Sequence, residues 1–385
     1  MGSKLYSLQL AKQEGMDLVV GKMLKKILIL NWMDPRNPKA GGQEKYCYEI
    51  ARRLTNDGYQ VTWIASGYRG LEESEYYNGI NIVRVGNIYT VFIRAFFKYI
   101  EFKSYDFVFL SMNSIPFLAP LHRKRRIIML HHRIDLGVMR FKAGIMGFVS
   151  YFLQEFITPL LYRNDYIITN SNSSKEDFLL LGYKHINTVK LGVDIHDEQL
   201  VKKENIIVSP GPVKPWKHHD WAMKAFSYLD EDWTLVIFGS VESEEYAKHL
   251  EIISYSLGIK KRVKFLGKIS RDKVDEIFSK SKICLVATEK EGWGLVAMEA
   301  QSFGCPVVGF DVPGLRDSVI NQVTGILVNF GDITSLSEAL SFLSNDEISW
   351  KRMSEMAIKR SKLYDWNSCY VDFKNHMQEA LEEKA

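Results

Sequence analysis

Short apolar runs that alternate with helical patterns constrain this chain more than any other feature. Each run is three to five residues long and rich in β-branched side chains, as buried strands are. Strands that alternate with amphipathic helices predict an α/β protein with parallel sheets covered by helices on both faces. The expected strands are 26–30, 61–65, 81–85, 107–110, 127–130, 166–169, 206–209, 234–238, 262–266, 283–287, 306–310 and 326–328.

The length of 385 residues exceeds the usual size of one hydrophobic core and predicts two doubly wound domains. The stretch 193–205 is polar and lacks periodicity, so we interpret it as an interdomain linker. It separates an N-terminal domain at 23–192 from a C-terminal domain at 206–364, with a last helix at 365–385. Residues 1–22 are interpreted as a leader or an added extension and are left out of the fold prediction.

Composition excludes several classes of protein. The formal net charge of +4 is mild and argues against a nucleic-acid partner. The four cysteines form no C-x-x-C pair and no metal-spaced cluster, which favours buried, inert thiols in a reducing cytoplasm. The most apolar stretch, 144–162, contains Gln154, Glu155 and Pro159 and predicts a packed helix rather than a membrane span. A G-x-G-x-x-G fingerprint is absent, which weakens a dinucleotide-dehydrogenase interpretation.

Polar and glycine residues follow the expected strands where ligands bind in doubly wound sheets, at the carboxyl ends. In the first half His131, His132 and Arg133 follow the strand at 127–130. In the second half such residues recur after every strand but the last, and they include Gly211, Lys214, Lys217, Gly239, Gly267, Lys268, Gly314 and Arg316. Two such domains would bring two sets of strand ends to opposite sides of a cleft.

The stretch 288-TEKEGWGLVAMEAQSFGCPVVGF-310 is the most informative of these loops. Glu291 lies in the loop after a buried strand, and Glu299 lies inside the helix expected at 295–303. Glycines at 292 and 294 allow a ligand to approach the backbone closely, and the helix amino end favours an anion. The alternative is a solvated carboxylate beside an unrelated surface glutamate.

Taken together, these motifs resemble the family 4 glycosyltransferases over about residues 23–380. The glutamate–seven–glutamate motif is Glu291 to Glu299, and the glycine loop is 40-AGGQEKYCYEIARRL-54. The segments 170-NSNSSKEDFLLLGY-183, 190-KLGVD-194 and 304–328 follow in the family's order. The resemblance implies a GT-B fold of two Rossmann-like domains facing across a cleft. It also implies retaining sugar transfer from a nucleotide sugar, and a last helix that crosses back to the first domain.

The resemblance also assigns roles to individual residues. Glu291 would bind sugar hydroxyls, Glu299 the ribose hydroxyls, and Lys217 the donor diphosphate. His131 would lie near the donor sugar, although a structural histidine is the alternative. The expected catalytic residues are His131, Glu291 and Lys217. The expected donor-binding residues are Gly41, Gly42, Gly211, Lys214, Lys217, Gly267, Lys268, Glu291, Gly292, Trp293, Gly294, Leu295, Glu299 and Arg316.

One phosphate-binding cation is missing from its usual place. Pro212 stands where the family carries arginine, and His218 replaces a glycine after Lys217. Lys214 or Arg316 could supply the second cation, and the sequence does not decide between them.

No metal is expected. The triplet Asp230-Glu231-Asp232 resembles a metal motif of another glycosyltransferase fold, but it precedes the strand at 234–238 and so lies at the amino end. We interpret it as a solvated turn.

The acceptor is expected to be a glycan or a lipid-linked precursor bound by the first domain. The basic and aromatic segments 122–126 and 94–103 would favour anionic lipid headgroups, and solvated turns are the alternative. A cytoplasmic protein, peripheral at the inner face of the membrane, follows from this interpretation. Two other functions stay open: a GT-B nucleotide-sugar epimerase, and a non-catalytic partner that binds nucleotide sugar or glycan.

Overall fold

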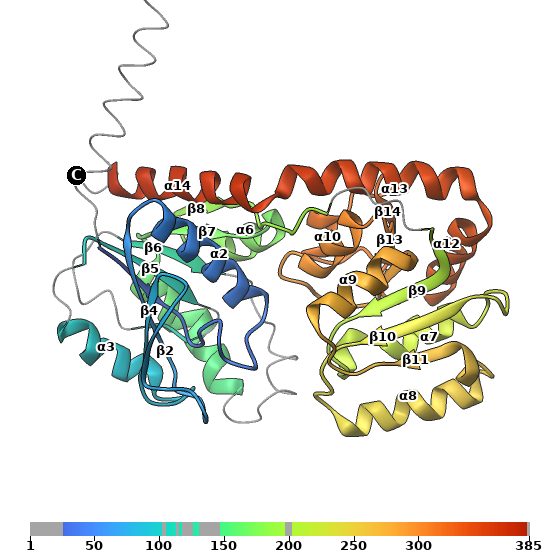
Figure 1. Ribbon diagram of the computed structural model, residues 1–385, viewed down its shortest axis with the longest axis horizontal. Coiled ribbons are helices and arrows are strands. Elements are labelled where there is room, and N and C mark those ends of the chain that lie inside the picture. The colour runs from blue at the N-terminus through green and yellow to red at the C-terminus, as the bar shows by residue number, and fades with distance from the viewer. Residues whose placement is uncertain are drawn as a thin grey trace, which may run out of the picture. The chain divides into compact units, whose positions relative to one another are not determined.

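A computed structural model of the chain describes residues 26–101, 105–112, 115–117, 126–130, 147–196 and 202–382. It divides into two compact units after Val189 and after Cys369, with residues 170–174 grouped with the second unit. The first unit includes the carboxyl-terminal part of the chain from Tyr370. Figure 1 shows a sheet with flanking helices in each unit.

The first unit is built on an eight-stranded sheet with the order β3-β4-β2-β1-β5-β6-β7-β8. All neighbours pair in parallel except β3 and β4, which are antiparallel. Asn78 and Gly79 connect these two strands with positive φ angles of 46° and 85°, as a two-residue hairpin turn requires. The strands are β1 (Lys26–Leu30), β2 (Gln60–Ala65), β3 (Ser74–Tyr77), β4 (Ile80–Arg84), β5 (Phe107–Met112), β6 (Arg126–Leu130), β7 (Tyr166–Thr169) and β8 (His185–Thr188).

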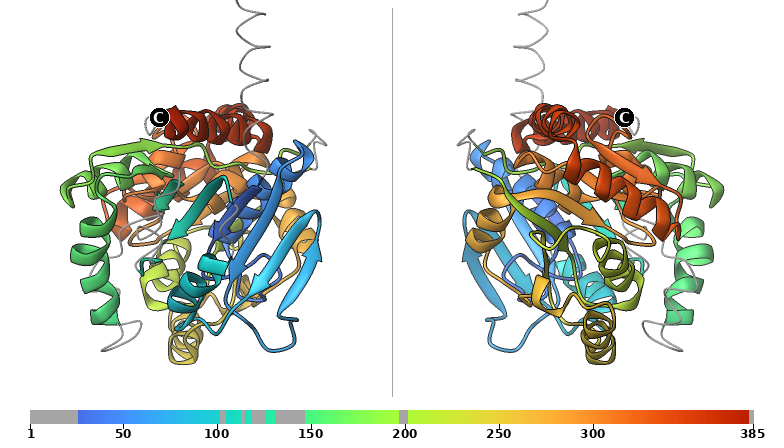
Figure 2. Two further views of the ribbon diagram at one scale, coloured as in Figure 1. Left: turned by 90° about the vertical axis from the view of Figure 1, so that its left-hand side faces the viewer. Right: turned by 90° about the vertical axis from the view of Figure 1, so that its right-hand side faces the viewer.

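Helices cover both faces of this sheet (Figure 2). On one face, Phe92 of α3 (Val91–Glu101) and Tyr162 of α5 (Thr158–Tyr162) join a core with Leu28, Val108 and Ile128. On the other face, α2 (Gly42–Asn56) buries Cys47 and Ile50. Helix α6 (Asn172–Leu180) follows β7.

The stretch expected as a packed helix is helical from residue 147 to 162, and residues 144–146 lie outside the described ones. Its middle turn, Leu153–Ile157, is a π-helix. Pro159 follows this turn and has no backbone N–H to donate. The Leu153 carbonyl accepts hydrogen bonds from the Thr158 amide and, at 2.9 Å, from the Thr158 hydroxyl. The expectation of packing was wrong for one face, since Phe148, Phe152, Phe156 and Leu160 are all exposed. Within the described residues, no helix has the length and apolar character needed to cross a membrane.

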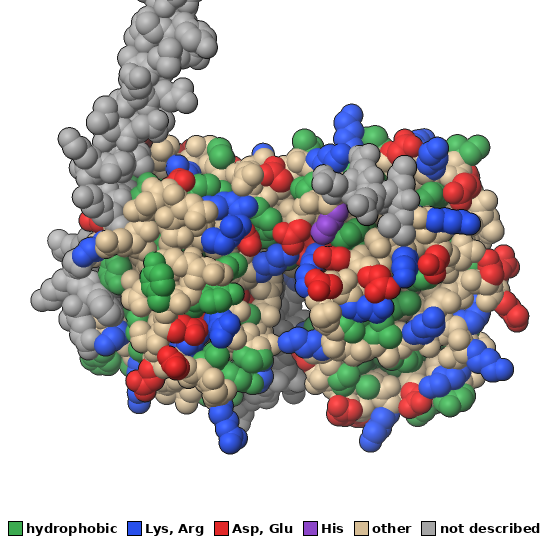
Figure 3. Space-filling model, viewed as in Figure 1, with side chains coloured by type: hydrophobic (Ala, Val, Ile, Leu, Met, Phe, Trp, Pro, Cys, Tyr) green, Lys and Arg blue, Asp and Glu red, His purple; other side chains and the backbone are tan. Residues whose placement is uncertain are grey.

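The second unit is built on a six-stranded parallel sheet with the order β11-β10-β9-β12-β13-β14. Its strands are β9 (Glu204–Pro210), β10 (Thr234–Phe238), β11 (Val263–Phe265), β12 (Ser281–Val286), β13 (Val307–Phe310) and β14 (Gly325–Val328). Its helices are α7 (His219–Phe226), α8 (Glu244–Ser256), α9 (Arg271–Lys280), α10 (Leu295–Ser302), α11 (Leu315–Ser318), α12 (Ile333–Asn345) and α13 (Glu347–Ser361). Acidic and basic side chains lie interspersed over the face of this unit that Figure 3 shows.

All twelve expected strands are present, with ends shifted by at most two residues, so the predicted parallel α/β architecture is confirmed. Two short strands, β3 and β8, were not predicted. The four cysteines are buried as expected, and burial raises the pKa of the Cys47, Cys284 and Cys305 thiols.

The last helix, α14 (Trp366–Glu382), packs onto the first unit from Tyr370 onward. The ring of Phe373 is fully buried and meets Phe109 of β5 edge to face at 5.0 Å between centroids. The Tyr370 hydroxyl donates to the Asp57 carboxylate at 2.7 Å, and the Lys374 ammonium does so at 2.9 Å. The helix is therefore part of the first unit's core.

Phe373→Ala should destabilise the first unit by about 3–5 kcal/mol, because it leaves a cavity against β5 that the sheet cannot collapse to fill. The measurement is the free energy of unfolding in urea, followed by circular dichroism. The matched control is Val371→Ala on the same helix, whose side chain is 57% exposed and whose loss should change stability by no more than about 0.5 kcal/mol. Equal effects of the two substitutions would contradict this account of the helix.

Candidate functional site

Three glycine turns meet at the carboxyl ends of β9, β10 and β11. The Gly211 amide donates to the Phe238 carbonyl at 2.9 Å, and the Gly239 amide donates to the Gly267 carbonyl at 2.9 Å. A Cβ atom on Gly239 would lie only 2.1 Å from the Gly211 oxygen, and both residues have φ angles near +140°. Only glycine permits this approach. Gly211 and Gly267, both expected in the donor site, are thus placed at one edge of the sheet.

Lys217 and Glu291 are brought into direct contact, although 74 positions separate them. Lys217 ends a short 3₁₀ turn, Pro215–Lys217, after β9, and Glu291 lies in the loop after β12. The Lys217 ammonium forms an ion pair with the Glu291 carboxylate, and both side chains are mostly shielded from solvent. The Glu289 amide also donates to the Trp216 carbonyl at 3.2 Å, which joins the two loops a second time.

The loop that carries Glu291 is held from the other side by Gly314. The Glu291 amide donates to the Pro313 carbonyl at 3.1 Å. A Cβ atom on Gly314, whose φ is 83°, would lie 2.1 Å from the Glu291 oxygen. The loops after β12 and β13 are therefore packed backbone against backbone, and this packing fixes the position of the Glu291 backbone.

Glu299 lies in the second turn of α10 and is only 8% exposed. Its Oε1 atom accepts a hydrogen bond from Nη1 of Arg271 at 2.7 Å. Arg271 is the first residue of α9, and its guanidinium also contacts Asp275 at 2.9 Å and Asp194 at 3.9 Å. The buried carboxylate of Glu299 is thus held in place by a charge-assisted bond.

Arg271 was missed from the sequence. It comes after Gly267 and Lys268, which were expected in the site, but nothing in the sequence links it to Glu299, 28 positions later. Asp194, which also contacts Arg271, accepts a hydrogen bond from the indole of Trp366 at 2.8 Å. Asp194, the acidic residue that ends 190-KLGVD-194, was the available signal for Arg271. A charged residue at the end of an apolar segment is expected to have a partner of opposite charge.

Both residues suggested as the second phosphate-binding cation are engaged with carboxylates. The Lys214 ammonium bonds to Glu242 at 3.0 Å and lies 4.9 Å from the centre of the Trp216 ring. The Arg316 guanidinium bonds to Asp311 at 2.9 Å, in a pair that is about half exposed. An exposed pair is worth at most about 1 kcal/mol, so Arg316 can exchange its partner at little cost.

The other residues expected in the donor site of this unit, apart from Lys268, lie at or just before the start of α10. Gly294 precedes the helix with a φ angle of 83°, and Leu295 is its first residue. The ring of Trp293 is buried and packs 5.2 Å from the ring of Tyr364, so its backbone is the part that can face a ligand. Gly292 precedes it, and Lys268 is exposed in the loop after β11.

In the first unit, Gly41 and Gly42 are exposed at the amino end of α2. The Gly41 amide donates to Oε2 of Glu44 at 2.8 Å, and the Trp32 indole donates to Oε1 at 3.1 Å. Burial raises the pKa of Glu44, although these bonds oppose the shift. Glu44 therefore fixes the helix start that presents the two glycines.

Other expected residues lie outside the described ones. These are His131, His132, Arg133 and residues 122–125 of the basic cluster. Of that cluster only Arg126 is described, and it bonds to Asp165 at 2.8 Å.

The acidic triplet lies where the sequence predicted, before β10 at the amino end of the strands. Asp232 accepts a hydrogen bond from the side chain of Asn205, which belongs to β9. Among the described residues, no three histidine, cysteine or carboxylate side chains are grouped in a way that could hold a metal ion.

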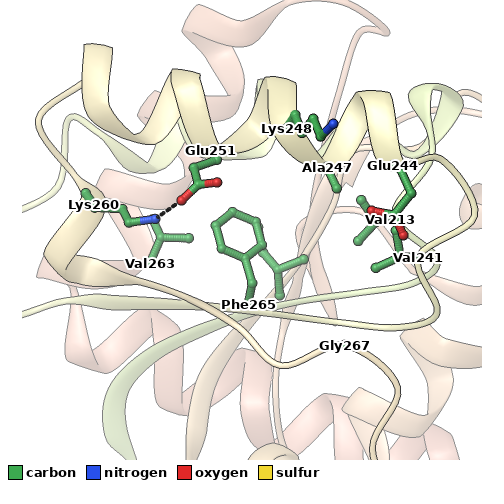
Figure 4. Close-up of a pocket in the computed structure, with 11 residues that line it drawn as sticks. Val213, Val241, Glu244, Ala247, Lys248, Glu251, Lys260, Val263, Phe265 and Gly267 are labelled. Carbon is green, nitrogen blue, oxygen red and sulfur yellow. Dashed lines mark hydrogen bonds and ion pairs between the residues drawn. The ribbon is translucent and has the colours of Figure 1, made fainter.

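A cavity of about 510 Å³ lies beside α8 at the edge of the second sheet, as Figure 4 shows. Val213, Val263 and Phe265 form its apolar wall, and Lys260 and Glu251 pair across it at 2.8 Å. Of the expected donor residues only Gly267 lines it. Lys217, Glu291 and Glu299 do not line it, so this cavity is distinct from the site that contains them.

His219, two residues after Lys217, is buried at the start of α7. Its Nδ1 atom lies 3.0 Å from the Ser209 hydroxyl. Burial, assisted by the nearby charge of Lys217, lowers its pKa to about 4. The imidazole is thus neutral at physiological pH and supports the backbone beneath the Lys217 turn.

The depressed pKa of His219 predicts an acid-sensitive fold. The unfolded chain, with an ordinary histidine pKa near 6.5, binds the proton more readily than the folded chain does. The contribution of His219 is therefore fully present above about pH 6.5 and is lost as the pH falls toward 4, by up to about 3 kcal/mol. Urea unfolding of the wild type and of His219→Gln, measured between pH 4 and 7.5, should show a flatter pH dependence for the variant. Parallel curves would refute this role, and exposed His185→Gln is the control.

Each half of the chain matches a glycosyltransferase family model. The family model described as Glycosyltransferase Family 4 matches residues 40–197, and the model described as Glycosyl transferases group 1 matches residues 193–360. The two adjoining matches together span most of the chain.

Two curated relatives illustrate the range of similarity. A D-inositol 3-phosphate glycosyltransferase of Xylanimonas cellulosilytica is 29% identical over 42% of this chain, a match that spans only 39% of the relative's length. An N-acetyl-alpha-D-glucosaminyl L-malate synthase of Bacillus anthracis is 24% identical, and the match covers 85% of this chain and 90% of the relative.

Solved structures show the same fold. Sucrose-phosphate synthase from Thermosynechococcus elongatus superposes with a TM-score of 0.78 at 18% identity, covering 93% of this chain and all of that one. The Anabaena protein HepE in complex with UDP-glucose has a TM-score of 0.73 at 18% identity, covering 93% of this chain and 99% of that one. These likenesses establish the two-domain GT-B fold that the sequence motifs implied.

Proposed function

The chain belongs to glycosyltransferase family 4, and we propose that it is a retaining enzyme that moves one sugar from a nucleoside diphosphate sugar to a hydroxyl acceptor. The observation that carries the proposal is the contact between Lys217 and Glu291 at the carboxyl ends of β9 and β12, with Glu299 buried in the helix that follows the Glu291 loop. The relatives named above are transferases or synthases, which gives no support to the epimerase alternative.

Lys217 is proposed to stabilise the leaving group. When the bond between the sugar and the donor diphosphate breaks, the electron pair goes to the phosphate oxygen, and negative charge accumulates there. A positioned ammonium in a shielded site lowers the energy of that charge. The amino end of α10 adds backbone donors to the same anion.

Glu291 and Glu299 are proposed to divide the sugar and the ribose between them. Glu299 is rigid, because it is buried and bonded to Arg271, so it suits the invariant ribose. Glu291 lies in a loop and meets Lys217. A diphosphate would take over Lys217 and release the Glu291 carboxylate to accept bonds from the sugar hydroxyls. In this scheme donor binding itself activates the sugar site.

UDP-sugars are the first donors to test, since HepE was solved with UDP-glucose. GDP- and dTDP-sugars remain candidates as well. The acceptor is proposed to be a hydroxyl group of a glycan or lipid-linked precursor. The names of two relatives contain inositol 3-phosphate and L-malate, so small acceptors that carry an anionic group belong in the same panel. A peripheral position at an anionic membrane is proposed for the lipid-linked case.

Transfer is proposed to need no metal, because Lys217 and backbone amides supply the charge stabilisation that a divalent cation would otherwise supply. The protein should release UDP or GDP from its donor in the presence of an acceptor, and millimolar EDTA should reduce the rate less than two-fold. Loss of activity in EDTA, restored by Mg²⁺ or Mn²⁺, would contradict metal independence. Failure with every donor and acceptor would favour the non-catalytic partner, and interconversion of a free nucleotide sugar would favour an epimerase.

Substitution of the two glutamates should have different effects on nucleotide affinity and on transfer rate. Glu299→Gln removes a charged acceptor for the ribose, worth about 1.5–3 kcal/mol, so the nucleotide alone should bind about ten-fold or more weakly. Glu291→Gln should not weaken nucleotide binding, because its partners are on the sugar and its loss frees Lys217. Its effect should be a lower transfer rate from poorer sugar positioning.

Calorimetric affinity for UDP and GDP, measured beside transfer rate, tests this assignment. Glu276→Gln on the surface of α9 is the control and should change neither quantity, since Glu276 contacts only exposed lysines. The division of roles is wrong if Glu291→Gln weakens nucleotide binding as much as Glu299→Gln does.

A further inference from the structure

The turn that carries Lys217 ends in a strained backbone conformation at His218. The φ and ψ angles of His218 are 46° and 42°, which place a bulky residue in the left-handed region that glycine ordinarily occupies. A residue of this kind persists in such a conformation only where the surrounding structure holds it there. The contacts of His218 show what holds it.

The backbone of His218 is shared by two elements. Its amide donates to the Pro215 carbonyl at 3.0 Å and so closes the turn that ends at Lys217. Its carbonyl accepts hydrogen bonds from the amides of Trp221 and Ala222 at 3.0 and 3.1 Å and so begins α7. A change in the backbone angles of His218 would therefore move the Lys217 turn relative to α7.

The ring of His218 is held by an aromatic cluster. It stacks on the indole of Trp221, with 4.0 Å between the ring centroids and 19° between the ring planes. It also meets the ring of Phe330 edge to face at 5.9 Å. Trp221 in turn meets Phe310, the fully buried last residue of β13, edge to face at 5.7 Å. The ring is thus anchored through Trp221 to the core of the second unit.

The imidazole of His218 acts by packing. Burial lowers its pKa, although the charges of Asp220 and Glu289 oppose the shift, so the ring is uncharged at neutral pH. Its Nε2 atom is buried and has no hydrogen-bond partner among the residues that the structure describes. Stacking of a neutral ring offsets the strain of the left-handed backbone.

Lys217 directly precedes His218, so a fixed His218 fixes the point from which the lysine side chain starts. The lysine stem runs along the bare backbone of Gly211, where a Cβ atom would lie 3.6 Å from both Cδ and Cε of the lysine. The ammonium then meets the Glu291 carboxylate. Because the Gly314 loop holds Glu291 from the other side, both partners of the ion pair start from a fixed backbone.

We propose that His218 is a positioning residue for the donor diphosphate: its stack on Trp221 holds the end of the Lys217 turn and so keeps the ammonium where the leaving group binds. The inference rests on the proposed function, which assigns the diphosphate to Lys217. A glycine would adopt the left-handed conformation without strain but would not be confined to it. The stacked histidine restricts the turn before the ligand arrives, and a cation that is already in position binds its anion with a smaller loss of entropy.

Calorimetry on the full chain tests this with UDP and GDP, compared with uridine and guanosine, which carry the same base and ribose but no phosphate. His218→Ala keeps the strain and removes the stack, so the diphosphate that binds the wild type should bind about five- to ten-fold more weakly. The matching nucleoside, measured by competition with that diphosphate, should lose less than about two-fold, because its groups are assigned to other residues. A histidine that only stabilised the fold would change both affinities alike or change neither.

Two further variants test the stack and the backbone separately. Trp221→Leu removes the partner of the ring and should weaken diphosphate binding as His218→Ala does. Because both variants break one contact, the double variant should bind at most about two-fold more weakly than either alone. His218→Gly removes the strain and should recover part or all of the loss. If His218→Ala does not fold, Trp221→Leu carries the same comparison of diphosphate with nucleoside.

Gln322→Ala is the matched control. Gln322 is also a non-glycine residue with a positive φ, 62°, and is exposed in the loop before β14. Its substitution should change neither affinity. A loss seen in His218→Ala and absent from Gln322→Ala therefore belongs to the Lys217 turn and not to left-handed residues in general.

Four results would overturn the proposal. These are diphosphate binding by His218→Ala within about two-fold of the wild type, equal losses for diphosphate and nucleoside, additive effects of His218→Ala and Trp221→Leu, and no recovery in His218→Gly. Failure of the proposed function looks different, since the wild type then binds neither UDP nor GDP and this inference fails with it. If nucleotide binding is lost in Glu299→Gln and unchanged in His218→Ala, the donor site stands and only the role of His218 is wrong.

Discussion

The pairing of β9 with both β10 and β12 is the constraint on which the second unit depends. Because β9 stands at the point where the strand order reverses, the loops that follow it and its neighbours leave the sheet in different directions. Lys217 follows β9 and Glu291 follows β12, so their contact is a direct result of this register. Glycines at 211 and 239 then allow the turns to approach more closely than any side chain would permit.

The charges of the proposed donor site are balanced within the protein itself. Lys217 is paired with Glu291, and Arg271 with Glu299. A pair shielded from solvent is costly to break by removing one partner, but exchanging one anion for another preserves the charge balance. A diphosphate can therefore replace Glu291 on Lys217 at lower cost than it could enter an unpaired site. Glu299 differs, since its carboxylate is buried and bonded to Arg271, and this fits the fixed ribose-binding role proposed for it.

The sequence was sufficient for features that depend on local periodicity and insufficient for those that depend on register. The buried strands of both sheets were predictable because their apolar runs are continuous. The strands β3 (SEYY) and β8 (HINT) were not, because these short edge strands are only partly buried and carry no continuous apolar run. Glu291 and Glu299 were found from their motif. Arg271 was not, because its partner lies in another helix and only the folded sheet brings the two together.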